Sequence, residues 1–148
     1  MYGQNKSDSS LGWLTTSSTK AHGTLGDNLV LTAFDLVENI AHTADPAAAR
    51  TITTPTAALI VAAIKVKASD SKCSAGDTFQ FSFINLGSVG VDETCTMTAG
   101  TGCTVVGFAD IENPVTTHDA FSVGSSLWAV QVTNALSGSE AVDVIRLA

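Results

Sequence analysis

Three histidines, His22, His42 and His118, are the side chains of this sequence best suited to proton transfer or metal binding. They lie far apart in the chain, and none has a spacing such as His-x-x-x-His, which places two imidazoles on one metal ion. We therefore expect each histidine in a loop or on the surface. The sequence predicts no metal site and no other cofactor.

The other groups that catalysis uses give no clearer pattern. Asp92, Glu93 and Glu112 lie in turn-like stretches, and an acid and base pair among them can be assigned only once the fold is known. The chain has no Gly-x-Ser-x-Gly motif, and Gly100-Thr101-Gly102 is too short and wrongly placed for a phosphate loop. The sequence therefore predicts that the protein is not an enzyme.

The three cysteines, Cys73, Cys95 and Cys103, are odd in number and match no metal-ligand spacing. In a reducing compartment we expect buried free thiols. Cys95 and Cys103 flank the turn-like residues 99–102, so a disulfide across a hairpin is the alternative. The register of that hairpin places their sulfur atoms on opposite faces, which argues against the disulfide unless a bulge shifts the register.

Length and composition fit one domain with appendages. The chain has 148 residues, of which 45% are hydrophobic and only 14% charged, and its formal net charge is −7. No apolar run is long enough to cross a bilayer, and no basic cluster favours nucleic acid as a partner. The first residues lack the pattern of an export signal, so we expect synthesis in the cytoplasm. A surface so poor in charge suits a protein that packs against neighbours.

Residues 1–28 are rich in Ser, Thr and Gly and predict an extended N-terminal arm. Its scattered apolar residues Leu11, Trp13 and Leu14 are candidates for contact with a partner, because isolated apolar side chains in a polar segment become ordered only where they find a pocket. The alternative is an arm that packs along its own domain.

Residues 29–148 predict one all-β domain, a β-sandwich or jelly-roll-like fold with one short helix. The helix is expected over 55–64, with Thr54 as its N-cap, Pro55 at the first helical position and an apolar face of Leu59, Ile60, Ala63 and Ile64. Residues 29–37 give a mixed signal that fits one or two strands. Further strands are expected at residues 79–83, 93–98, 103–106, 127–133 and 141–147, each with apolar alternation or a turn beside it.

Four aromatic residues, Trp13, Phe108, Phe121 and Trp128, could in principle form a platform for stacking sugars. Trp128 begins an alternating strand, and we expect it in the core instead.

Several segments resemble the β-rich domain of decoration, cement and head-fibre proteins of tailed bacteriophages, including those of cyanobacteria. They are Pro55–Ile64, Gly76–Phe79, Phe83–Asn85, Thr96–Val105, Val132–Asn134 and Ser137–Val142. The resemblance covers about two thirds of the chain, and its motifs are turns and strands without catalytic residues.

This resemblance implies a virion structural protein on the outer surface of the capsid. Such a protein would bind and stabilise the assembled lattice of the major capsid protein as a homotrimer, without nucleic acid, membrane or small-molecule substrate. Two alternatives stay open: a head-fibre or tail adhesin module that binds host glycans, and a minor jelly-roll capsid protein. A hydrolase is the weakest possibility, because no nucleophile, base and oxyanion donor stand together in the sequence.

Overall fold

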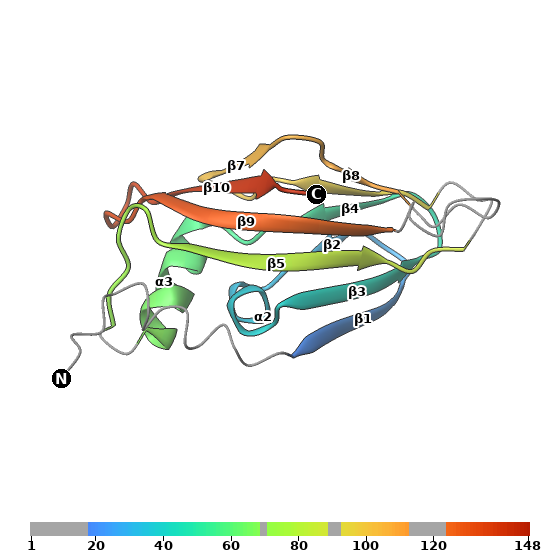
Figure 1. The fold of residues 1–148 in the computed structure, drawn as a ribbon, viewed down its shortest axis with the longest axis horizontal. Coiled ribbons are helices and arrows are strands. Elements are labelled where there is room, and N and C mark those ends of the chain that lie inside the picture. Colours follow the sequence, from blue (N-terminus) through green and yellow to red (C-terminus); the bar gives the residue numbers. More distant parts are fainter. Residues whose placement is uncertain (1–17, 69–70, 89–92, 113–123) are drawn as a thin grey trace.

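A computed structural model describes residues 18–68, 71–88, 93–112 and 124–148. In these ranges the chain forms ten strands and two helices (Figure 1). The elements are β1 (Thr19–Leu25), β2 (Leu29–Val30), α2 (Ala33–Glu38), β3 (Ala41–Pro46), β4 (Arg50–Thr53), α3 (Ala57–Lys67), β5 (Thr78–Asn85), β6 (Cys95–Thr98), β7 (Cys103–Val106), β8 (Asp110–Ile111), β9 (Ser125–Asn134) and β10 (Ala141–Arg146).

The strands form two sheets that share one hydrophobic core. The first has six strands in the order β1-β3-β5-β9-β10-β7, and the second has four in the order β2-β4-β6-β8. In Figure 1 the six-stranded sheet faces the viewer over β9, β5 and β3, with the four-stranded sheet behind it. Side chains from both sheets and both helices meet in a single buried cluster. The predicted mostly-β, two-sheet domain is thus confirmed at this coarse level.

The connectivity differs from that of a jelly roll, in which antiparallel strands follow Greek-key paths. The chain passes from the six-stranded to the four-stranded sheet three times in succession, as β1–β2, β3–β4 and β5–β6. The successive passes stack in parallel, because β1 pairs with β3, β3 with β5, β2 with β4, and β4 with β6 in parallel register. The first part of the fold is therefore a parallel coil, and antiparallel pairing enters with β8, β9 and β10. The jelly-roll-like topology is not confirmed.

The two helices return the chain from the four-stranded sheet to the six-stranded one. α2 connects β2 to β3, and α3 connects β4 to β5, so both lie toward the same end of the sheets and pack together (Figure 1). The expectation of one helix was wrong, because residues 33–38 form a helical turn and only Leu29–Val30 are extended. Thr32 caps this helix, its hydroxyl accepting a hydrogen bond from the amide of Asp35 at 3.1 Å.

The longer helix, α3, begins two residues later than predicted and ends at Lys67. Its N-cap is Thr56, whose hydroxyl accepts from the amide of Leu59. Thr54 instead follows the end of β4, and its amide donates to the carbonyl of Thr98 on β6. Pro55 consequently precedes the cap. Ile60, Ala63 and Ile64 are buried as expected, but Leu59 is 57% exposed. The apolar residues of α3 extend around more of the helix than one face, so composition alone does not identify the buried side.

Part of the predicted arm belongs to the domain. Residues 19–25 form β1, an edge strand of the six-stranded sheet. The predicted arm of residues 1–28 therefore extends too far toward the C-terminus, because it includes this strand. For this stretch the structure agrees with the alternative of an arm that packs along its own domain. Leu11, Trp13 and Leu14 lie outside the described residues.

Candidate functional site

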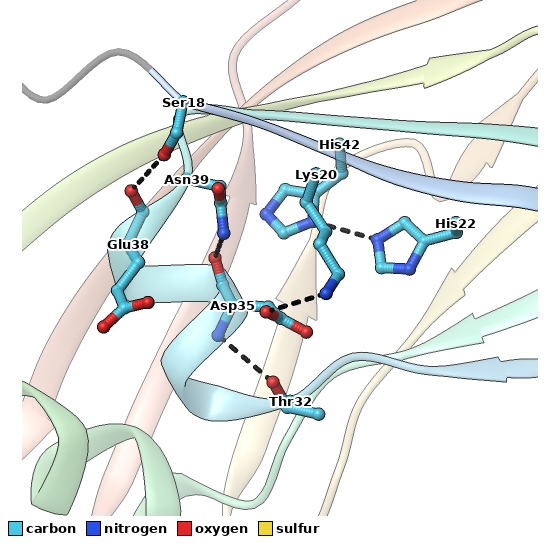
Figure 2. A network of polar contacts seen from close by, with 8 residues as sticks. All are labelled: Ser18, Lys20, His22, Thr32, Asp35, Glu38, Asn39 and His42. Atoms are coloured by element: carbon cyan, nitrogen blue, oxygen red, sulfur yellow. Dashed lines mark hydrogen bonds and ion pairs between the residues drawn. The ribbon is translucent and has the colours of Figure 1, made fainter.

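Two histidines from neighbouring strands form the most unusual polar contact of the described chain. His22 on β1 and His42 on β3 approach to 3.1 Å between Nε2 and Nδ1, and their rings stack with centroids 5.4 Å apart (Figure 2). Sequence reasoning expected both in loops or on the surface. That expectation was wrong for His42, which is completely buried, and wrong in position for His22, which is partly buried on a strand. His118 lies outside the described residues.

The position of His42 follows from the alternation of β3. His42, Ala44 and Pro46 point inward in turn, while the residues between them are half-exposed. The ring of His42 meets Phe81 edge to face at 5.7 Å, and His22 stacks over Phe83 at 6.4 Å. The signal for this site was the alternation of residues 41–46, which contains a polar residue at an inward position and was therefore missed.

Burial makes His42 a poor base. It is the largest of the effects that lower the pKa of His42 to about 4, with the nearby His22 adding to it and Asp35 opposing it. Burial also lowers the pKa of His22. The Nε2 atom of His42 has no hydrogen-bond partner among the described residues. A proton added to this ring would place a charge in the core that the nearby Asp35 compensates only in part.

An ion pair between β1 and helix α2 lies beside the two histidines. Lys20 of β1 forms an ion pair with Asp35 of α2 at 3.3 Å, beside the two imidazoles (Figure 2). Burial would raise the pKa of Asp35, but hydrogen bonds from Thr32 and Lys20 and the charge of Lys20 outweigh it and hold that pKa below its usual value. Because both charged groups are partly exposed, this pair adds little stability by itself.

A second set of contacts ties the beginning of β1 to the end of α2. The hydroxyl of Ser18 donates to the backbone carbonyl of Glu38 at 2.9 Å, and the side-chain amide of Asn39 donates to the carbonyl of Asp35 at 2.8 Å (Figure 2). The carboxylate of Glu38 forms an ion pair with Lys67 at the end of α3. These contacts hold the start of the edge strand β1 against α2, and the Glu38–Lys67 pair joins α2 to α3.

The aromatic contacts of the histidine pair continue across the six-stranded sheet. Phe81 stacks on Trp128 at 6.5 Å, and the guanidinium of Arg146 lies 5.1 Å from the centre of the Trp128 ring. The indole nitrogen of Trp128 donates to the hydroxyl of Ser126 at 2.7 Å. Trp128 is fully buried, which confirms its predicted place in the core and removes it from any sugar-binding platform. Phe108 is exposed, and Trp13 and Phe121 lie outside the described residues.

A separate buried polar group lies at the C-terminal end of β5, two residues beyond Phe83. The side-chain amide of Asn85 donates to the carbonyls of Glu93 and Ile111 at 2.8 and 3.0 Å, and its oxygen accepts from the amide of Gly87. The carboxylate of Glu93, itself buried, accepts from the amide of Ser88. Glu93 therefore satisfies backbone groups of the β5–β6 connection. Of the other carboxylates considered from the sequence, Glu112 is exposed and accepts from Thr94, and Asp92 lies outside the described residues.

The cysteines follow the expectation of free thiols where the structure tests it. Cys95 on β6 is buried and Cys103 on β7 is partly buried, and neither forms a disulfide. The two strands are not a hairpin, because β6 belongs to the four-stranded sheet and β7 pairs with β10 in the other. Burial raises the pKa of Cys95 to about 11, which keeps the thiol protonated at neutral pH.

The outer face of the six-stranded sheet is uncharged along its two central strands. The cross-strand pairs there are Thr78 with Gln131, Gln80 with Ala129, Ser82 with Leu127 and Ile84 with Ser125. A shallow depression of about 610 Å³ lies on this face beside Ile40 and Leu127. No described helix covers it, since both helices lie on the core side of the sheet (Figure 1).

The described residues bring together no further set of reactive groups. Among them, no three or more His, Cys, Asp or Glu side chains are placed to hold a metal ion, and no helix is long and apolar enough to cross a membrane. Comparison with protein-family models, curated proteins and solved structures found no match to this chain.

Proposed function

We propose that this protein is a capsid decoration (cement) protein of a tailed bacteriophage. It binds the outer surface of the assembled major capsid lattice as a homotrimer, stabilises that lattice and catalyses no reaction. The proposal begins from the resemblance of residues 55–148 to the β-rich domain of such proteins. The structural observation that supports it is the uncharged outer face over β5 and β9, with its shallow depression, a surface of the kind that packs against neighbouring subunits.

The mechanism needs binding alone. A protein that binds the assembled lattice and not its separate subunits stabilises the lattice by mass action. Three copies joined in a trimer multiply modest contacts through effective concentration, so a small interface on each copy is sufficient. An acidic chain, with a formal net charge of −7, suits the outer surface better than the inner surface, where packaged nucleic acid is negatively charged.

Two leucines, one on β9 and one in the turn that follows it, allow a matched test. Leu127 lies on the outer face of β9, and Leu136 is 72% exposed in the turn between β9 and β10. Leu127→Lys should lower the binding of the purified protein to particles that lack it by about tenfold, the effect of losing about 1.4 kcal/mol of contact energy. Leu136→Lys should bind like the wild type. Sedimentation of the protein with the particles measures both.

Copy number and oligomeric state complete the test. Quantitative mass spectrometry of purified particles should find the chain in a fixed ratio to the major capsid protein, and light scattering should give a trimer. A chain that is the most abundant shell protein would instead be a lattice-forming capsid protein, and one that binds host glycans on an array without binding particles would be an adhesin. Either result, or equal binding by the two leucine variants, would contradict the proposal.

The proposed role of Leu11, Trp13 and Leu14 as partner contacts needs a deletion that ends at residue 17. A longer deletion would remove Lys20 and part of β1, and with them the contacts to Asp35 and His42. The deletion of residues 1–17 should clearly reduce particle binding, whereas the melting temperature of the free protein should fall only slightly.

A further inference from the structure

An apolar groove runs along the outside of the two helices. Its volume is about 760 Å³, and its walls come from the end of β2 and the start of α2, from residues 53–56 before α3, from α3 itself, and from Gly100 and Thr101. Val30, Phe34, Leu59 and Val66 line it with exposed side chains, and Leu59 and Val66 are 57% and 68% exposed. Exposed apolar side chains gathered around one depression mark a surface that binds something apolar.

The described chain begins beside this groove. Ser18 is bonded to the last residue of α2 through the carbonyl of Glu38, and the carboxylate of Glu38 is paired with Lys67. Lys67 directly follows Val66, which lines the groove. Through these two contacts Ser18 is held near one end of the groove, while Ala33 and Phe34 line it at the opposite end of α2.

The residues before Ser18 have both the length and the side chains to occupy the groove. Trp13 and Leu14 stand five and four positions before Ser18, so an extended chain carries them up to roughly 13–18 Å from it. The six-residue helix α2 is about 9 Å long, so the part of the groove beside α2, as far as Ala33 and Phe34, lies within that reach. A tether of only a few residues also gives an effective concentration of the order of millimolar, far above that of a second molecule in dilute solution.

We propose that in the free protein this groove binds residues Leu11, Trp13 and Leu14 of the same chain. Burial of an indole and two leucine side chains would offset the cost of ordering the segment, and it would cover the apolar walls of the groove. The inference concerns the free protein and does not depend on a role in a capsid. If that role is correct, the same three residues must leave the groove before they can contact a partner.

Tryptophan fluorescence tests this directly, because Trp13 and Trp128 are the two tryptophans of the chain. The spectrum of the wild type minus that of Trp13→Phe gives the emission of Trp13. Docking in the groove predicts blue-shifted emission that acrylamide quenches poorly and that does not change on dilution. Leu59→Asp should shift this emission to that of a solvent-exposed indole, and Val66→Asp should do the same.

Leu136→Asp is the matched control, since it changes an exposed leucine outside the groove and should leave the Trp13 emission unchanged. Unchanged far-ultraviolet circular dichroism and a cooperative urea transition show that the variants are folded. Exposed Trp13 emission in the wild type would overturn the proposal. Buried emission that persists in both groove variants, or that is lost on dilution, would also overturn it and assign Trp13 to another surface or to a second copy.

Discussion

The buried His42 predicts a protein that loses stability in mild acid. Burial lowers the pKa of His42 to about 4 in the folded state, against 6.5 for an ordinary histidine. Between these two values the unfolded chain binds a proton that the folded chain does not bind. Stability is therefore complete above pH 6.5 and decreases as the pH falls toward 4.

The size of the effect follows from the two pKa values. Their difference corresponds to about 3 kcal/mol, of which roughly 2 kcal/mol should be lost between pH 7 and pH 4.5. This is a large part of the 5–15 kcal/mol that is usual for a domain, so it should be visible as a lower urea midpoint. The window lies above the usual pKa of aspartate, so most carboxylates contribute little to it.

His42→Leu isolates the contribution of this one ring. The variant has no ionisable group at the buried position, so its free energy of unfolding should change by about 2 kcal/mol less than that of the wild type over the same pH range. Absolute stabilities cancel in this comparison, which removes the effect of the altered packing. His22→Gln retains His42 and should keep most of the acid sensitivity.

Urea unfolding at pH 7 and pH 4.5, followed by circular dichroism, measures all three proteins. Parallel losses in the wild type and His42→Leu would refute the reasoning. A nuclear magnetic resonance titration of His42 with a midpoint near 6.5 would refute its premise. In either case we would conclude that β1, the edge strand whose His22 stacks on this ring, moves away and lets water reach His42.

Two further substitutions test contacts elsewhere in the fold. Asn85→Ala leaves two buried backbone carbonyls and one amide without their partner and should lower the free energy of unfolding by about 3 kcal/mol, measured in urea; a loss below 1 kcal/mol would show that water replaces the side chain. Gly100→Ala places a methyl group against the backbone carbonyl of Thr54 and should cost about 1–3 kcal/mol, whereas Gly26→Ala, where that methyl meets open space, is the control and should be nearly neutral.

The sequence identified strands where side chains alternate against the core. The aromatic alternation at residues 79–83 corresponds to β5, and the predicted strands at 127–133 and 141–147 correspond to β9 and β10. It failed at residues 33–38, where Thr32 and Asp35 form a helix N-terminus inside an apolar run that also fits a strand. Short apolar runs carry both signals, and here the cap decides.

The sequence pattern could not predict the order and direction of the strands in the two sheets. Alternation indicates that a strand has one buried face, but it does not specify which strand lies beside it or in which direction. The parallel pairs join β1 with β3 and β3 with β5, strands separated by a turn, a strand of the other sheet and a helix. β1 itself carries a weak signal, because as an edge strand it is polar along most of its length.

The histidine pair was missed for the same reason. His22 and His42 stand twenty residues apart, and nothing in their spacing shows that a strand of the other sheet and a helix lie between them. Parallel stacking then places the two strands in contact and brings both rings to the same point. A search for metal or catalytic spacing detects ligands on one element or in a short loop, so it does not find pairs that a parallel coil creates.

These contacts make the N-terminal edge of the domain the place where acid and the arm act on the same element. β1 is held by the His42 ring on one side and, through Lys20 and Ser18, by α2. The ion pair of Glu38 with Lys67 connects α2 to α3 and so to the groove. A proton on His42 should weaken the attachment of β1, and residues 1–18 directly precede that strand. If residues 11–14 occupy the groove as proposed, their release and the loosening of β1 should favour one another, because Ser18 joins the two segments and is itself bonded to α2.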